Sequence, residues 1–97
     1  MNCIDFEKII SEDTIIIDIR DCEDYYRAHI PNSKNINHIE LILHPNLYLE
    51  VGKIYYIICD QGKVSSSVIK MLKDTQYKLI NINDGFDNWK GPIASLC

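Results

Sequence analysis

YYIICDQGKVSSS, residues 55–67, joins an apolar run to a cysteine, a polar loop with one glycine, and three serines. The run begins at Lys53, after Gly52, and residues 53–59 are expected to form a strand. Residues 65–75, SSSVIKMLKDT, predict a helix that serines can cap. The apolar face expected for that helix holds Val64, Val68, Met71 and Leu72. Cys59 is therefore expected at the end of a strand, shortly before the N-terminus of a helix.

Two more strands are expected, one before this stretch and one after it. They are residues 14–19, TIIIDI, and the weaker residues 77–83, YKLININ. Short helices are expected at residues 6–12, 22–29 and 38–43. Strands alternating with helices predict one α/β domain over residues 1–97. In this three-layer α/β/α arrangement, helices cover both faces of a mostly parallel sheet of about five strands.

Composition and charge exclude several classes of function. The chain has 97 residues and a formal charge of −4 without a basic stripe, which disfavours nucleic-acid binding. No signal peptide or membrane-spanning segment is visible, so we expect a cytoplasmic protein that does not contact membranes. The four cysteines show neither a CxxC pair nor the Cys/His spacing of a zinc site. Free thiols and no bound metal are therefore expected.

The loop after Cys59 has the composition of an anion-binding turn. Gly62 allows a tight turn, and successive N–H groups can point toward the sulfur beside the positive end of the helix dipole. A free cysteine titrates at about 8.5, and at helix N-termini this value can fall to about 3.5–7.5. Such a loop can hold a thiolate at neutral pH. From spacing alone, a nucleophile and a buried strand-end thiol are equally favoured for Cys59.

Polar residues follow the expected strands at the ends where parallel sheets gather their reactive groups. They are Asp18 with Arg20, Cys59, and Asp84 with Gly85. We expect these three places to be neighbours in the fold.

Three stretches, in the right order, resemble the rhodanese-like single-domain sulfurtransferases. Residues 15–36, IIIDIRDCEDYYRAHIPNSKNI, are similar to that family's Asp-x-Arg strand end, acidic helix, Gly-His-Ile-Pro-Gly-Ala turn and Asn-Ile strand. Residues 54–77, IYYIICDQGKVSSSVIKMLKDTQY, are similar to its strand, Cys-x-x-Gly-x-Arg-Ser loop and following helix. Residues 79–93, LININDGFDNWKGPI, resemble its Gly-Gly-Phe-x-x-Trp segment. The resemblance implies the rhodanese-like fold.

The resemblance also implies which residues carry the chemistry. Cys59 would be the nucleophile that accepts sulfur, and the loop that cradles the resulting persulfide would be Asp60, Gln61, Gly62, Lys63, Val64 and Ser65. Supporting positions would be Asp18, Arg20, His29, Gly85, Phe86 and Trp89. No cofactor is implied beyond the covalent persulfide. The implied partners are small sulfur donors or protein persulfides and thiol acceptors, for a monomer or weak dimer.

Two loop positions depart from the family pattern. Val64 stands where the family usually carries Arg, and Asp60 places a carboxylate next to the nucleophile. Thiosulfate would lose a guanidinium partner and meet a negative charge, so persulfide donors are expected instead. The alternative is a catalytically weak rhodanese-like module used for binding or regulation. Phosphatase or arsenate reductase activity is disfavoured because residues 60–70 contain no Arg.

Overall fold

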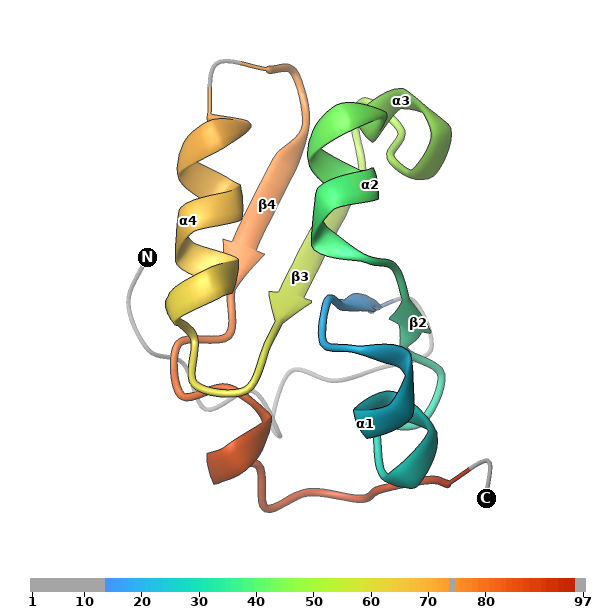
Figure 1. Ribbon diagram of the computed structural model, residues 1–97. Coiled ribbons are helices and arrows are strands. Elements are labelled where there is room, and N and C mark those ends of the chain that lie inside the picture. The colour runs from blue at the N-terminus through green and yellow to red at the C-terminus, as the bar shows by residue number, and fades with distance from the viewer. Residues whose placement is uncertain (1–13, 74, 96–97) are drawn as a thin grey trace.

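The computed structural model describes residues 14–73 and 75–95, and its strands lie side by side in one sheet (Figure 1). The strands are β1 (Ile15–Asp18), β2 (Lys34–Asn35), β3 (Ile54–Ile58) and β4 (Lys78–Asn81). Their order is β2-β1-β3-β4, and every neighbouring pair is parallel. The expected parallel α/β architecture is confirmed. The described residues hold four strands, where about five were expected.

Four helices lie between the described strands along the chain, and a short 3-10 helix follows the last of these strands. They are α1 (Cys22–Arg27), α2 (His38–Leu43), α3 (Pro45–Tyr48), α4 (Lys63–Met71) and the short 3-10 helix η2 (Phe86–Asn88). The helix expected at 38–43 is confirmed, and the one expected at 22–29 is confirmed as far as Arg27. The helix expected at 6–12 lies outside the described residues. Single-turn α3 and η2 were not predicted, because so short a segment shows no helical periodicity. No described helix has the length and apolar character needed to span a membrane.

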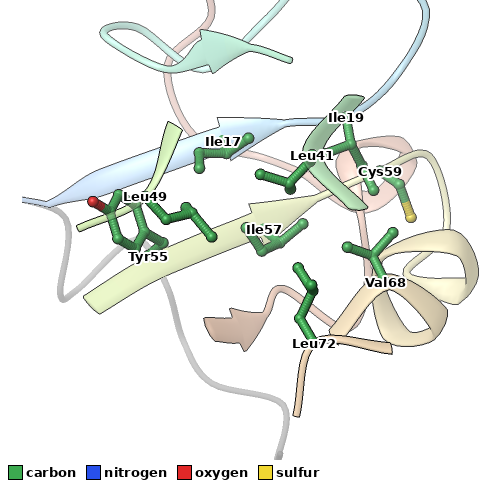
Figure 2. Packing of buried hydrophobic residues seen from close by; sticks show 9 residues of the cluster. All are labelled: Ile17, Ile19, Leu41, Leu49, Tyr55, Ile57, Cys59, Val68 and Leu72. Carbon is green, nitrogen blue, oxygen red and sulfur yellow. The ribbon is translucent and has the colours of Figure 1, made fainter. Parts of the chain in front are cut away.

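The apolar strands β1 and β3 bury side chains on both faces of the sheet. Ile17 and Ile57 point toward α2 and α4, where they meet Leu41, Val68 and Leu72 (Figure 2). The alternate residues Ile16 and Ile58 pack on the other face against Ile30, Ile82, Phe86 and Trp89. This two-sided burial explains why the strand sequences are apolar without alternation.

Helix α4 differs from the expectation in its start and in its apolar face. It begins at Lys63 rather than near Ser65, and Gly62 is its N-cap, without a capping side chain. Val68 and Leu72 are buried as expected, but Val64 and Met71 are 46% and 66% exposed. Ser65 is the buried residue of the first turn. The loop that enters the helix therefore turns a hydroxyl, not an apolar side chain, toward the sheet.

The register of the sheet brings its polar strand ends together. Asp18 pairs with Ile58, and Ile57 pairs with Asn81, so β1, β3 and β4 end at the same edge. The N–H of Phe86 donates to the carbonyl of Cys59 at 2.8 Å, and the guanidinium of Arg20 lies 4.0 Å from the centre of the Phe86 ring. The expected neighbourhood of the three strand ends is confirmed.

Candidate active site

Cys59 lies directly after β3, the strand between β1 and β4 in the sheet. Only 4% of the residue is exposed. Its sulfur is directed toward the loop and first turn of α4 (Figure 2). This placement puts a thiol at the carboxyl edge of a parallel sheet, where such folds bind their ligands.

The first turn of α4 donates backbone hydrogen bonds to the sulfur. The N–H of Gly62 lies 3.1 Å from the Cys59 Sγ, and the N–H of Ser65 lies 3.3 Å from it. The sulfur thus takes the place of a capping side chain, which explains why the serines do not cap this helix. Lys63 and Val64, as the first helical residues, have N–H groups without an intrahelical acceptor. These donors and the helix dipole can stabilise negative charge at the sulfur.

Gly62 is required by the path of this loop. Its φ is +83°, and a Cβ atom placed there would lie 1.9 Å from the backbone oxygen of Asn83. The loop therefore passes over the end of β4 at a distance that no side chain permits. This close approach places the Gly62 N–H beside the sulfur.

A second loop, residues 83–87, interlocks with the first. The N–H of Asp87 donates to the carbonyl of Asp60 at 3.0 Å. Gly85 has a φ of +69°, and a Cβ atom there would lie 2.3 Å from the same carbonyl oxygen. Gly85 thus supports the site through the close contact of two backbones.

Ser65 and Asn81 complete the surroundings of the sulfur. The Ser65 Oγ lies 3.2 Å from the Cys59 Sγ, and its hydroxyl bonds the side-chain oxygen of Asn81. The Asn81 Nδ2 donates to the carbonyl of Gly62 at 3.1 Å. Sequence reasoning did not single out Asn81. Its one signal was an amide side chain directly after Leu79 and Ile80, at the end of β4.

Asp18 and Arg20 form a buried ion pair beside the site. Arg20 donates from Nε to the Asp18 Oδ1 at 3.0 Å and from a terminal nitrogen to Oδ2 at 2.8 Å. The same terminal nitrogen donates to the carbonyl of Ala28 at 2.6 Å. This pair ties the end of β1 to the segment after α1. Arg20 is therefore engaged in the architecture and does not take the place of the arginine missing from the loop.

The side chains of His29 and Trp89 both donate hydrogen bonds to backbone carbonyl groups of nearby segments. The His29 Nδ1–H donates to the carbonyl of Tyr25 at 2.7 Å, and the two rings stack 3.9 Å apart. The backbones of His29 and Ala94 exchange two hydrogen bonds, of 3.0 and 2.8 Å. The Trp89 indole N–H donates to the carbonyl of Pro92 at 2.9 Å. Both side chains thus make structural contacts.

The exposed side of the loop is acidic and partly apolar. Burial raises the pKa of Asp60, and the nearby Asp87 raises it further, against an opposing effect of Arg20. Gln61 and Lys63 are exposed. Across residues 14–73 and 75–95, no group of three or more His, Cys, Asp and Glu side chains is arranged to hold a metal ion.

Comparison with known families identifies the family to which this fold belongs. A family model, the rhodanese-like domain, matches residues 4–92. The chain belongs to the rhodanese-like domain family. The matched residues of this rhodanese-like domain include Cys59 and the loop that follows it.

Similar proteins include sulfurtransferases from bacteria. This rhodanese-like domain is 33% identical to "Putative sulfur carrier protein YrkF" of Bacillus subtilis (strain 168), covering 88% of this chain and 46% of that protein. It is 31% identical to "Putative sulfurtransferase YtwF" of the same strain, covering 88% of this chain and 82% of that protein. Identity is 28% to "Thiosulfate sulfurtransferase GlpE" of Pseudoalteromonas translucida (strain TAC 125), covering 91% and 84%. The chain spans about half the length of YrkF but most of the other two.

Solved structures share the fold. A rhodanese-related protein from Thermoplasma volcanium superposes with a TM-score of 0.80 at 25% identity, covering 92% of this chain and 89% of that one. A rhodanese-like domain protein from Staphylococcus aureus has a TM-score of 0.76 at 28% identity, covering 88% and 83%. The rhodanese fold is therefore shown by sequence and by structure.

Proposed function

We propose that this rhodanese-like domain is a sulfurtransferase of the cytoplasm that carries sulfane sulfur as a persulfide on Cys59. The observation that carries the proposal is the pair of N–H groups, from Gly62 and Ser65, at 3.1 and 3.3 Å from a buried cysteine sulfur. Family membership and the sulfurtransferase relatives support the same reaction class. The protein needs no cofactor other than the covalent persulfide.

The proposed reaction has two transfer steps. The Cys59 thiolate attacks the outer sulfur of a donor R–S–SH, which forms Cys59–S–SH and releases R–S⁻. An acceptor thiolate R′–S⁻ then attacks the outer sulfur of Cys59–S–SH. That step restores the Cys59 thiolate and releases the acceptor persulfide R′–S–SH. The N–H groups of the loop stabilise the anionic sulfur in both steps.

The surface of the loop favours donors with little negative charge. Val64 is 46% exposed at the position of the missing arginine, and the carboxyl group of Asp60 is exposed at the next residue after the nucleophile. The anionic sulfonate group of thiosulfate would therefore have no guanidinium to bind there, and the carboxyl group of Asp60 would oppose the effect of a nearby cation. Low-molecular-weight or protein persulfides are therefore the proposed donors, and thiols are the proposed acceptors.

Sulfur loading tests the proposal directly. We expect the protein, incubated with glutathione persulfide, to gain the mass of one sulfur atom on the peptide that contains Cys59. Addition of excess glutathione should remove it, because the acceptor thiolate takes the outer sulfur. Intact and peptide mass spectrometry measure both results. Failure to load from glutathione persulfide, polysulfide and thiosulfate would reject this function and leave the alternative, a rhodanese-like binding module.

Arginine at position 64 should restore the use of thiosulfate. We expect Val64→Arg to raise the kcat/KM for thiosulfate by about 10-fold or more, because one charge-assisted bidentate contact contributes on the order of 1.5–3 kcal/mol. Thiocyanate formation with cyanide as the acceptor measures this rate. Met71→Arg, exposed at 66% near the end of the same helix, is the matched control and should change nothing. Equal rates for Val64→Arg and the wild type would refute this account of donor selection.

A further inference from the structure

A chain of hydrogen bonds leads from the sulfur of Cys59 through Ser65 to Asn81. The sulfur lies 3.2 Å from the Ser65 Oγ, whose hydroxyl bonds the Asn81 Oδ1. The three residues are 4%, 0% and 8% exposed. Because all three side chains are buried, neighbouring protein groups rather than solvent set the direction of each hydrogen bond between them.

The amide of Asn81 has one orientation that satisfies its neighbours. Its Nδ2 lies 3.1 Å from the carbonyl oxygen of Gly62 and 2.9 Å from the Oδ1 of Asn83. A backbone carbonyl only accepts hydrogen bonds, so the NH₂ group must face it. The Oδ1 of Asn81 then faces Ser65, and an amide oxygen also only accepts. The one hydroxyl proton of Ser65 is consequently donated to Asn81.

This direction decides what Ser65 offers to the sulfur. With its proton on the Asn81 side, the hydroxyl presents lone pairs to Cys59, which accept the proton of a thiol and repel a thiolate. A thiolate gains the hydroxyl as a donor only if Ser65 turns away from Asn81. The buried amide oxygen of Asn81 is then left without a donor, which is unfavourable.

We propose that Asn81 is a positioning residue that directs the Ser65 hydroxyl away from Cys59 and so favours the protonated form of the resting nucleophile. It opposes the stabilisation that the N–H groups of Gly62 and Ser65 give to the thiolate. The thiolate is the form of cysteine that oxidants attack, so a retained proton protects the idle site. The inference rests on the proposed function only in naming Cys59 as the nucleophile.

Charged side chains also stand on the elements that surround the sulfur. They are Asp18 at the end of β1, Arg20 just after it, Asp60 in the loop, Lys63 and Lys70 on α4, His38 and Glu40 on α2, and Asp87 on η2. None of these side chains is changed by substitutions at positions 65 and 81. Their fields are therefore common to all variants compared below.

A double-mutant cycle on the alkylation of Cys59 tests the inference. The rate of iodoacetamide reaction at Cys59, followed by peptide mass spectrometry against pH, gives a midpoint for each protein. In Asn81→Ala the hydroxyl is free to donate to the sulfur, so the midpoint should fall by about 0.5–1 pH unit. In the Ser65→Ala background the same substitution should have no effect. Ser67→Ala, whose hydroxyl donates to the carbonyl of Lys63, is the control and should match the wild type.

Two results would overturn the inference. An unchanged or higher midpoint in Asn81→Ala would show that Asn81 does not hold the hydroxyl away. An equal fall in both backgrounds would show that water entering the new space, rather than Ser65, stabilises the thiolate. Alkylation does not require sulfur transfer, so this outcome is independent of whether the protein loads sulfur.

A vibrational measurement covers the case in which Asn81→Ala does not fold. The infrared S–H band of Cys59 is isolated as the difference between the wild type and Cys59→Ser. Ser65→Ala removes the acceptor of the thiol proton, so this band should move to higher frequency. A band at the same frequency in both proteins would mean that the thiol does not donate to Ser65, and the inference would fail.

Discussion

Cys59→Ser is expected to abolish sulfur loading and transfer. A serine oxygen is hardly ionised at neutral pH and does not form a persulfide, so the first transfer step has no nucleophile. Loss of a residue that forms a covalent intermediate lowers turnover by about 10⁴-fold or more. We expect no added sulfur by mass spectrometry after incubation with glutathione persulfide. Serine keeps an acceptor for the loop N–H groups, so the midpoint of thermal unfolding should move little.

Cys22→Ser is the matched control for this experiment. Both cysteines are free thiols, but Cys22 is exposed at the first residue of α1 whereas Cys59 is buried in the loop. The control should therefore load sulfur as the wild type does. Full loading of Cys59→Ser, or its loss in Cys22→Ser, would move the nucleophile away from Cys59.

Gly62→Ala is expected to damage stability and sulfur loading together. The position has a φ of +83°, which a residue with a Cβ adopts at a cost on the order of 1–3 kcal/mol. The added Cβ would also lie 1.9 Å from the backbone oxygen of Asn83, so the loop or the end of β4 must shift. We expect the free energy of unfolding to fall by about 3 kcal/mol or more. The shift moves the Gly62 N–H away from the sulfur, so loading should slow by about 100-fold.

Gly52→Ala separates the two causes of this effect. Gly52 also has a positive φ, of +92°, but a Cβ atom there meets nothing within 4 Å. We expect the free energy of unfolding of Gly52→Ala to fall only by the cost of the positive φ, about 1–3 kcal/mol. Sulfur loading should be unchanged. Urea unfolding followed by the fluorescence of the single tryptophan, Trp89, measures both variants. Equal losses for the two would show that the contact with Asn83 does not constrain the loop.

Local sequence patterns were enough to predict β1, β3 and β4 and the order strand, cysteine, loop and helix around Cys59, whereas the two-residue β2 was implied only by the family resemblance. The apolar run around Ile17 predicted a strand buried on both faces and the run around Ile57 predicted a second strand, and the two clusters of the core show both strands buried on two sides. The residues after β3 predicted a turn at Gly62 and a helix behind it. These features depend on the conformational preferences of a few adjacent residues, which a sequence states directly.

The direction of the first turn of α4 was predicted incorrectly. Periodicity placed Val64 and Met71 on the apolar face, yet both are exposed and Ser65 is buried. Helical spacing alone does not predict which side of a helix faces the sheet when a polar side chain has a hydrogen-bond partner in the protein interior. Here the partners are the Cys59 sulfur and Asn81, and they turn Ser65 inward.

The sequence by itself determined that the chain has a parallel α/β fold with a cysteine between a strand and a glycine-containing loop that leads into a helix. Only the tertiary structure decided which groups meet the sulfur. Asn81 comes from a different strand, and its contact with Ser65 and Gly62 depends on the register of β4 against β3. Hydrogen bonds between distant segments follow from packing of the whole sheet, and no local pattern of residues encodes them.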